Sequence, residues 1–267
     1  MTTRSATVVG LLGWISLCLS SYAATLPAAA PASNQIDVAF PLPQFNREYA
    51  AQAGNPQPTA GRLLIYLPAQ FDPRRSWPLF VINATADRGR TSIMDAPWYR
   101  SLTADGCVVL ATDANIRPRT DTVPWRIAVL SAALNVMHRD WPASRNWPAI
   151  FAGISGGAKR AEWNSAILAE TRSVRIAGMF LAGINDDRMP EALQSFHPPP
   201  EFRNVPIWIS SGRNDPIAKP EAARDVRNSL VHLGFRNVRM GTFNGGHEVD
   251  RGDLRDALRW FKTLGKF

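Results

Sequence analysis

The sequence contains little cysteine and little histidine, with two residues of the former and four of the latter among 267. Removal of residues 1–23 would take Cys18 away and leave Cys107 as the only thiol, so no intramolecular disulfide could form. No cluster of His, Cys or carboxylate residues has the spacing of metal ligands. The run 155–159 ends in lysine but lacks the earlier glycine of a phosphate-binding loop. The sequence therefore predicts a protein that needs no metal or other cofactor.

Basic residues are in moderate excess, but they are not concentrated in one part of the chain. Lys and Arg number 30 against 22 Asp and Glu, which gives a formal charge of +8. The arginines are scattered, and no basic run is interleaved with aromatic residues, so a nucleic-acid groove is not expected. A charge of this size favours solubility or attraction to an anionic envelope.

Long hydrophobic runs are also missing. The apolar stretch 6–19 is shorter than the roughly 18 to 20 residues needed to cross a bilayer. It follows a single charge at Arg4 and precedes small residues that end at Ala23, which is the pattern of a secretory signal. We expect residues 1–23 to be removed and the mature protein to be secreted or periplasmic, with no stable membrane span. A retained membrane anchor and a lipid anchor at Cys18 are the alternatives.

The remaining chain divides into a short N-terminal segment and one large domain. Residues 24–60 are rich in Ala, Pro, Asn and Gln, and their prolines predict a loose segment with one short edge strand. In residues 61–267, short apolar runs alternate with helical patterns, which indicates a mostly parallel sheet with helices on both faces. The eight expected strands lie near residues 36–40, 63–67, 79–82, 107–112, 149–152, 176–182, 205–210 and 238–243.

Apolar residues recur at helical spacing in three later segments, 127–137, 223–233 and 254–261. Each stripe predicts a helix with one buried face. Aromatic residues beside such stripes usually pack in the core, and we expect this of Trp125, Trp141, Trp147, Trp163, Trp208 and Trp260.

A glycine-rich pentapeptide, Gly153–Gly157, closes the apolar run 148–152 and opens a run compatible with a helix. A serine at such a strand-to-helix turn takes a strained backbone conformation that holds its hydroxyl out of the sheet. The pattern G-x-S-x-G arises by chance in roughly one chain in ten of this length. Ser155 is therefore a candidate nucleophile only if the chain also supplies a base and an acid.

One histidine and one aspartate stand where those partners are needed. His247 follows the last expected strand and precedes the terminal helix, and a pair of glycines before it lets the loop reach over the sheet edge. Asp215 follows the strand at 205–210 and is the best candidate for the residue that orients the histidine. Asp186 and Asp187 follow the preceding strand and are its rivals.

The chain order Ser155, Asp215, His247 resembles that of the α/β-hydrolase superfamily, and the resemblance extends from Ile36 to Phe267. It implies a Ser-His-Asp triad. It also implies an oxyanion hole formed by the backbone N–H of Gly156 and by one N–H from the loop after the third strand. In that loop Asn83-Ala84 replaces the His-Gly pair of many relatives, which makes Thr85 the expected second donor.

Within that superfamily, secretion and short connections are most similar to single-domain esterases related to polyhydroxybutyrate depolymerases and feruloyl or acetyl-xylan esterases. The implied activity is the hydrolysis of carboxylic esters. The insertion 185–204 is too short for a large lid, so an open pocket and a polymeric or bulky ester are expected. Lys159 and Arg160 either recognise an anionic group of the substrate or form a solvated surface. A peptidase, an acyltransferase and a non-catalytic binding protein remain as alternatives.

Overall fold

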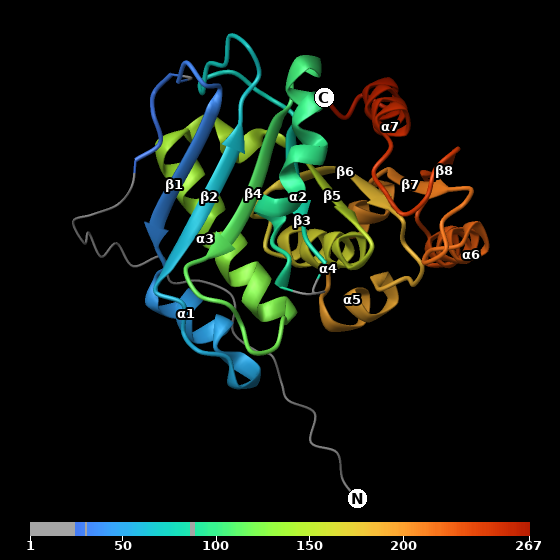
Figure 1. Cartoon of the computed structure of the whole chain (residues 1–267), viewed down its shortest axis with the longest axis horizontal. Coiled ribbons are helices and arrows are strands. Elements are labelled where there is room, and N and C mark those ends of the chain that lie inside the picture. Colours follow the sequence, from blue (N-terminus) through green and yellow to red (C-terminus); the bar gives the residue numbers. More distant parts are fainter. Residues whose placement is uncertain (1–24, 30, 86–88) are drawn as a thin grey trace, which may run out of the picture.

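Eight strands form one sheet with helices on both of its faces (Figure 1). The computed structural model describes residues 25–29, 31–85 and 89–267. The strand order is β1-β2-β4-β3-β5-β6-β7-β8; β1 and β2 run antiparallel to their neighbours, and all other pairs are parallel. The strands are β1 (Gln35–Pro41), β2 (Ala60–Tyr66), β3 (Leu79–Asn83), β4 (Val108–Ala114), β5 (Pro148–Ile154), β6 (Arg175–Ala182), β7 (Ile207–Gly212) and β8 (Val238–Phe243).

All eight expected strands are present, and the predicted fold class is confirmed. The central strands are apolar along their whole length because helices cover both faces of a parallel sheet. Every residue of β5 is buried, for example. Since β3 and β5 to β8 run parallel, their carboxyl ends meet along one edge of the sheet, where polar loops can converge.

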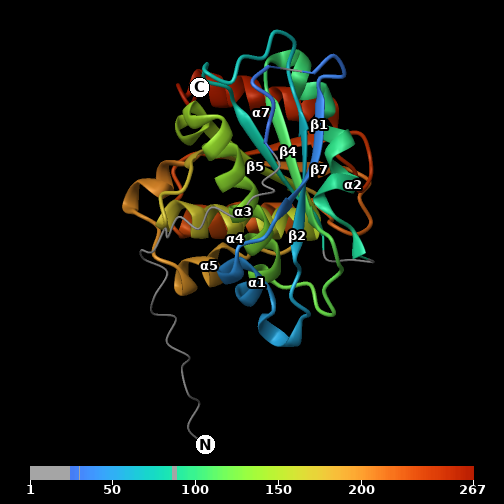
Figure 2. The ribbon, with the colours of Figure 1, turned by 90° about the vertical axis from the view of Figure 1, so that its left-hand side faces the viewer.

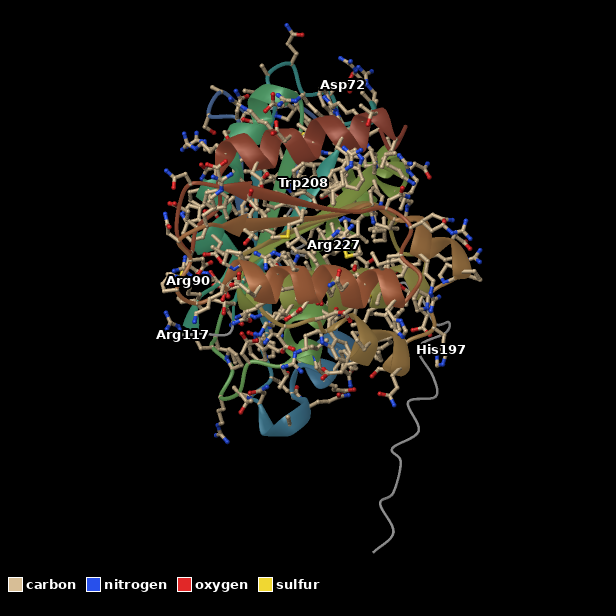
Figure 3. The ribbon with its side chains drawn as sticks, turned by 90° about the vertical axis from the view of Figure 1, so that its right-hand side faces the viewer. Asp72, Arg90, Arg117, His197, Trp208 and Arg227 are labelled. Atoms are coloured by element: carbon tan, nitrogen blue, oxygen red, sulfur yellow. The ribbon has the colours of Figure 1, made fainter. Side chains whose placement is uncertain are left out.

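The helices form two layers that sandwich the sheet. Residues of α3, α4 and α6 belong to the larger hydrophobic core on one face, and residues of α7 belong to the core on the other face. Figure 2 shows the α3 layer from the β1 side, and Figure 3 shows the sheet between α7 and α6. The helices are α1 (Gln44–Ala50), α2 (Ser92–Asp95), α3 (Val123–Asp140), α4 (Gly156–Glu170), α5 (Met189–Ser195), α6 (Pro220–His232) and α7 (Arg251–Thr263).

The N-terminal segment is more ordered than its prolines suggested. It contains helix α1 as well as the edge strand β1, so the prediction of a loose segment apart from one strand is wrong. Asn46 in α1 is buried, and its side-chain amide donates a 2.8 Å hydrogen bond to the carbonyl of Ala128 in α3. Pro43 stands immediately before α1, where a proline is compatible with the start of a helix. Helix α1 therefore packs onto the domain.

The predicted signal sequence, residues 1–23, lies outside the described residues. Secretion of the protein and removal of the signal sequence remain predictions. Within residues 25–29, 31–85 and 89–267, no helix has the length and apolar character required to cross a membrane.

Candidate active site

Ser155 occupies a strained turn between β5 and α4. Its backbone angles are φ 56° and ψ −123°, in a region that residues with a side chain rarely adopt. Its N–H donates to the carbonyl of Ala182 at the end of β6, which ties the turn to the neighbouring strand. A Cβ on Gly153 would lie 2.3 Å from the carbonyl carbon of Gly157, and one on Gly157 would lie 2.2 Å from the carbonyl oxygen of Asn83. The glycines are therefore needed for strand β3, strand β5 and helix α4 to approach one another.

Replacing Gly157 by Ala is expected to lower the free energy of unfolding by about 2 kcal/mol or more, since the methyl group would meet backbone atoms that cannot move alone. Thermal melting of the purified variant measures this. Gly246→Ala is the matched control, because a Cβ there meets nothing within 4 Å, and it should change stability by less than about 0.5 kcal/mol. Equal melting temperatures for the two variants would contradict the packing described for the turn.

His247 and Asp215 are hydrogen-bonded to each other. The Nδ1 atom of His247 lies 2.7 Å from Oδ2 of Asp215, whose side chain is fully buried. The other carboxylate oxygen, Oδ1, accepts 2.8 Å hydrogen bonds from the backbone N–H groups of Ile217 and Ala218. An aspartate fixed in this way favours the imidazole tautomer with hydrogen on Nδ1, which leaves Nε2 free to accept a proton.

The His247 ring lies over the carboxyl end of β6, beside the strand that carries Ser155. A Cβ on Gly183, the residue after β6, would lie 2.9 Å from two atoms of the ring. Gly183 directly follows Ala182, which binds the Ser155 backbone. Ser155 and His247 are both described by the structure, and Ser155 Oγ forms no hydrogen bond with the His247 imidazole. Catalytic hydrogen bonds of this kind are often long without substrate and shorten when it binds.

The rival carboxylates do not bind His247. Asp186 is half exposed and lies 2.6 Å from the Arg188 guanidinium. Asp187 accepts a hydrogen bond from the backbone N–H of Met189. Of the three aspartates considered from the sequence, Asp215 is the one that the structure brings to the histidine.

The other three histidines lie elsewhere. His138 is buried and its Nδ1 lies 2.9 Å from Ser144 Oγ, and burial lowers the pKa of its imidazole to about 4. The His197 side chain is 84% exposed, and Figure 3 shows it on the opposite side of the molecule from Arg90 and Arg117. His232 is exposed near the end of α6. None of the three is bonded to a carboxylate buried at the carboxyl edge of the sheet.

Gly156 and Thr85, the predicted oxyanion donors, lie against each other. A Cβ on Gly156 would lie 2.5 Å from Thr85 Oγ1, and both residues border the same cleft as Ser155. Asn83, which replaces the more usual histidine, is buried; its amide donates to the carbonyls of Val81 and Ala152. The run Asn83-Ala84-Thr85 also matches the N-glycosylation sequon, but the buried side chain of Asn83 makes it unsuitable for that modification. Residues 86–88, which continue the loop, lie outside the described residues.

A buried side-chain hydrogen bond connects this loop to the helix that begins at the serine. Asn164 in α4 donates a 2.7 Å hydrogen bond from Nδ2 to Oδ1 of Asn83 at the end of β3. The bond fixes the distance between the two chain segments that carry the predicted donors. Sequence patterns gave no sign of it, because the two asparagines are 81 positions apart.

A cleft of about 500 Å³ opens beside Ser155. Lys159, Arg160 and Trp163 of α4 line it, together with Arg188. The Arg160 side chain is only 12% exposed, so a solvated surface does not describe it. Trp163 was expected in the core with the other five tryptophans; those five are buried, whereas Trp163 is partly exposed in the cleft wall.

Glu162 is a buried carboxyl group that the sequence analysis missed. It lies in α4, is completely buried, and accepts a 2.9 Å hydrogen bond from the backbone N–H of Arg188. Burial raises the pKa of Glu162 well above 4.5, and the neighbouring Asp187 raises it further. No sequence pattern indicated this burial, which the fold creates by placing the Arg188 backbone, in the segment before α5, against the carboxyl group.

Because the folded-state pKa of Glu162 is raised, the folded protein holds this proton more tightly than the unfolded chain does. The associated stability is present below about pH 4.5 and is lost as the pH rises through the folded-state pKa. Glu162→Gln, which imitates the protonated acid, should therefore raise the melting temperature at pH 8 by about 3 °C, or roughly 1 kcal/mol, with a smaller effect at pH 5. The exposed Glu170→Gln in the same helix is the control. Stabilisation by Glu162→Gln at pH 5 alone would show that the sign is reversed.

No metal centre is evident in the part of the chain that the structure describes. No three His, Cys, Asp or Glu residues there are grouped closely enough to hold a metal ion.

Comparison with known proteins identifies the fold. No protein-family model matches the chain, and no curated protein matches its sequence significantly. Among solved structures, the chain is similar to a Bacillus cereus carboxylesterase (19% identity, TM-score 0.52, covering 83% of this chain and 99% of that one). It is also similar to Zea mays acyl-protein thioesterase 2 (13%, 0.55, 76% and 98%) and to an alpha-beta serine hydrolase homologue from Coxiella burnetii (14%, 0.53, 77% and 92%). The chain has the α/β-hydrolase fold.

Proposed function

We propose that the protein is a serine hydrolase that cleaves carboxylic esters through Ser155, His247 and Asp215. The observation that carries this proposal is the 2.7 Å hydrogen bond between His247 Nδ1 and the buried Asp215 carboxylate, formed at the sheet edge where Ser155 occupies a strained turn. Nothing about the fold alone requires a buried acid, a histidine and a strained serine to converge at one edge.

In the proposed mechanism, His247 Nε2 accepts the hydroxyl proton of Ser155 while Oγ attacks the ester carbonyl. Asp215 orients the ring and stabilises the imidazolium. Backbone N–H groups of Gly156 and Thr85 bind the oxyanion, where one such donor contributes roughly 3 kcal/mol to transition-state stability. His247 then gives the proton to the leaving alcohol. Water, deprotonated by the same histidine, releases the acid from the acyl-enzyme.

The open cleft suits a bulky ester or a polymer end. It is about 500 Å³ in volume, and the segment between β6 and β7 contributes only α5 and a short turn in place of a large lid. Together with the predicted signal sequence, this supports a secreted or periplasmic esterase similar to the polyhydroxybutyrate depolymerase and feruloyl esterase group. The similarity of this fold to those of a carboxylesterase and a thioesterase is consistent with acyl transfer to water as the reaction.

The purified protein should hydrolyse 4-nitrophenyl esters, and this is tested with a series of acyl chains beside matched peptide anilides. Parallel reactions with added alcohols, followed by product analysis, detect transfer to an acceptor other than water. Ester cleavage with release of free acid is the expected result. Exclusive cleavage of anilides would make the protein a peptidase, and transfer products without free acid would make it an acyltransferase.

A further inference from the structure

The cleft beside Ser155 has a positively charged wall formed by Lys159, Arg160 and Arg188, named here the cationic wall. Lys159 and Arg160 lie in the first turns of α4, and Arg188 comes from the segment that precedes α5. Figure 1 shows α5 next to α4, and the two helices are in contact. Among the described residues that line the cleft, two carboxylates, Asp121 and Glu191, stand against these three cations.

The positive charge at Arg160 is incompletely neutralised. Asp121 receives two hydrogen bonds, of 2.9 and 2.7 Å, from Arg126, and its Oδ1 lies 3.2 Å from the Arg160 guanidinium. All three side chains are between 10% and 13% exposed, so one carboxylate serves two poorly hydrated guanidinium groups. Asp113 also lies near Arg126, but burial raises its pKa. Burial lowers the pKa of the Arg160 guanidinium; the charge of Asp121 opposes this shift, and repulsion by Arg126 adds to it.

The other two cations, Lys159 and Arg188, form ion pairs with carboxylates that a bound anion can replace. Lys159 Nζ lies 3.5 Å from Asp186, and Arg188 lies 2.6 Å from the same carboxylate and 2.7 Å from Glu191. Both acids are about half exposed. Exposed ion pairs contribute little free energy, so exchanging one of these carboxylates for a substrate anion costs little.

We propose that the cationic wall binds an anionic group of the ester substrate, one helical turn away from the ester carbonyl that Ser155 attacks. Lys159 is four residues beyond Ser155 in α4, which places its backbone about 6 Å along the helix axis. Trp163, Val123 and Ile217 provide apolar surface in the same cleft for the atoms between the two groups. This inference rests on the proposed esterase function and names the class of ester: one that carries a carboxylate or a similar anion.

The experiment compares esters that carry a free carboxylate with the same esters in which that carboxylate is methylated and therefore uncharged. For an anion in the acyl part, the pair is the 4-nitrophenyl monoester of adipic acid and the same compound with its free carboxyl methylated. For an anion in the alcohol part, the pair is 4-acetoxybenzoate and its methyl ester. At low ionic strength, kcat/KM should be about tenfold or more higher for the anionic member of at least one pair, and this ratio should fall as salt is added.

Variants locate the effect in the cleft. Arg160→Gln and Lys159→Gln should each lower the anionic-to-neutral ratio of kcat/KM, by about tenfold and about threefold respectively. Lys159 is partly exposed, so its replacement tests the proposal even if Arg160→Gln fails to fold. Arg227→Gln removes one charge from the exposed face of α6 and should leave the ratio within about twofold.

The inference is overturned if the four esters are cleaved with no preference for an anion, or if a preference survives both cleft variants. If none of the four esters is cleaved and Ser155 does not react with a fluorophosphonate, the proposed esterase function is overturned, and the inference falls with it. The two failures are therefore distinguished by the neutral esters, which test the first proposal alone.

Discussion

Ser155→Ala should reduce kcat for a neutral ester by about a millionfold, close to the uncatalysed rate of the assay. The Ser155 hydroxyl is the protein group that bonds to the acyl carbon in the proposed mechanism, so its loss removes the acyl-enzyme pathway. Steady-state hydrolysis of a 4-nitrophenyl ester measures the effect. The strained backbone at Ser155 accepts Ala as readily as Ser, so the melting temperature should fall by no more than a few degrees.

Ser229→Ala provides the control for this result. Ser229 is in α6, away from the cleft, and its replacement should leave kcat within about twofold of the wild type. If Ser155→Ala retained more than about 1% of the wild-type kcat, a different nucleophile would have to be sought.

Asp215→Asn should reduce kcat by about 10⁴-fold, an effect known from serine proteases with the same arrangement. An asparagine that faces His247 with its NH₂ group favours the tautomer with hydrogen on Nε2, which cannot accept the serine proton. An asparagine that turns its oxygen toward Nδ1 instead presents NH₂ to the backbone N–H groups of Ile217 and Ala218. The first orientation leaves His247 in the wrong tautomer, and the second loses the hydrogen bonds to the two backbone N–H groups.

Asp187→Asn is the matched comparison, since Asp187 was a rival for the same role. It should lower kcat by less than about tenfold, because its carboxylate binds the Met189 backbone and lies near Glu162 rather than near His247. A large loss in Asp187→Asn with little loss in Asp215→Asn would show that the acid has been assigned wrongly, although the enzyme class would remain.

The strands and the positions of Ser155, Asp215 and His247 follow from short-range sequence patterns. Glycines around Ser155 are required by the close approach of strand and helix, and the apolar runs before each polar loop predict strands whose carboxyl ends meet at one edge. The structure shows the hydrogen bond between His247 and Asp215 that the chain order implied. It depends on the register of β7 and β8.

Features that depend on distant residues could not be predicted. The prolines of residues 24–60 suggested irregular chain, yet α1 is held by the contact of Asn46 with α3. The burial of Glu162 depends on the segment before α5, and the low exposure of Arg160 depends on Asp121, 39 positions earlier. Each of these side chains is polar, so the sequence alone predicts a surface position for it. Its burial depends on a partner that is distant in the chain.

Reaction with a fluorophosphonate probe tests the central claim most directly. Intact-mass analysis and peptide mapping of the labelled protein should show one adduct on the peptide that contains Ser155, and His247→Ala should slow its formation strongly because the serine would lose its base. An adduct on another residue, or no adduct under conditions that label a known esterase completely, would contradict the assignment of Ser155 as an activated nucleophile.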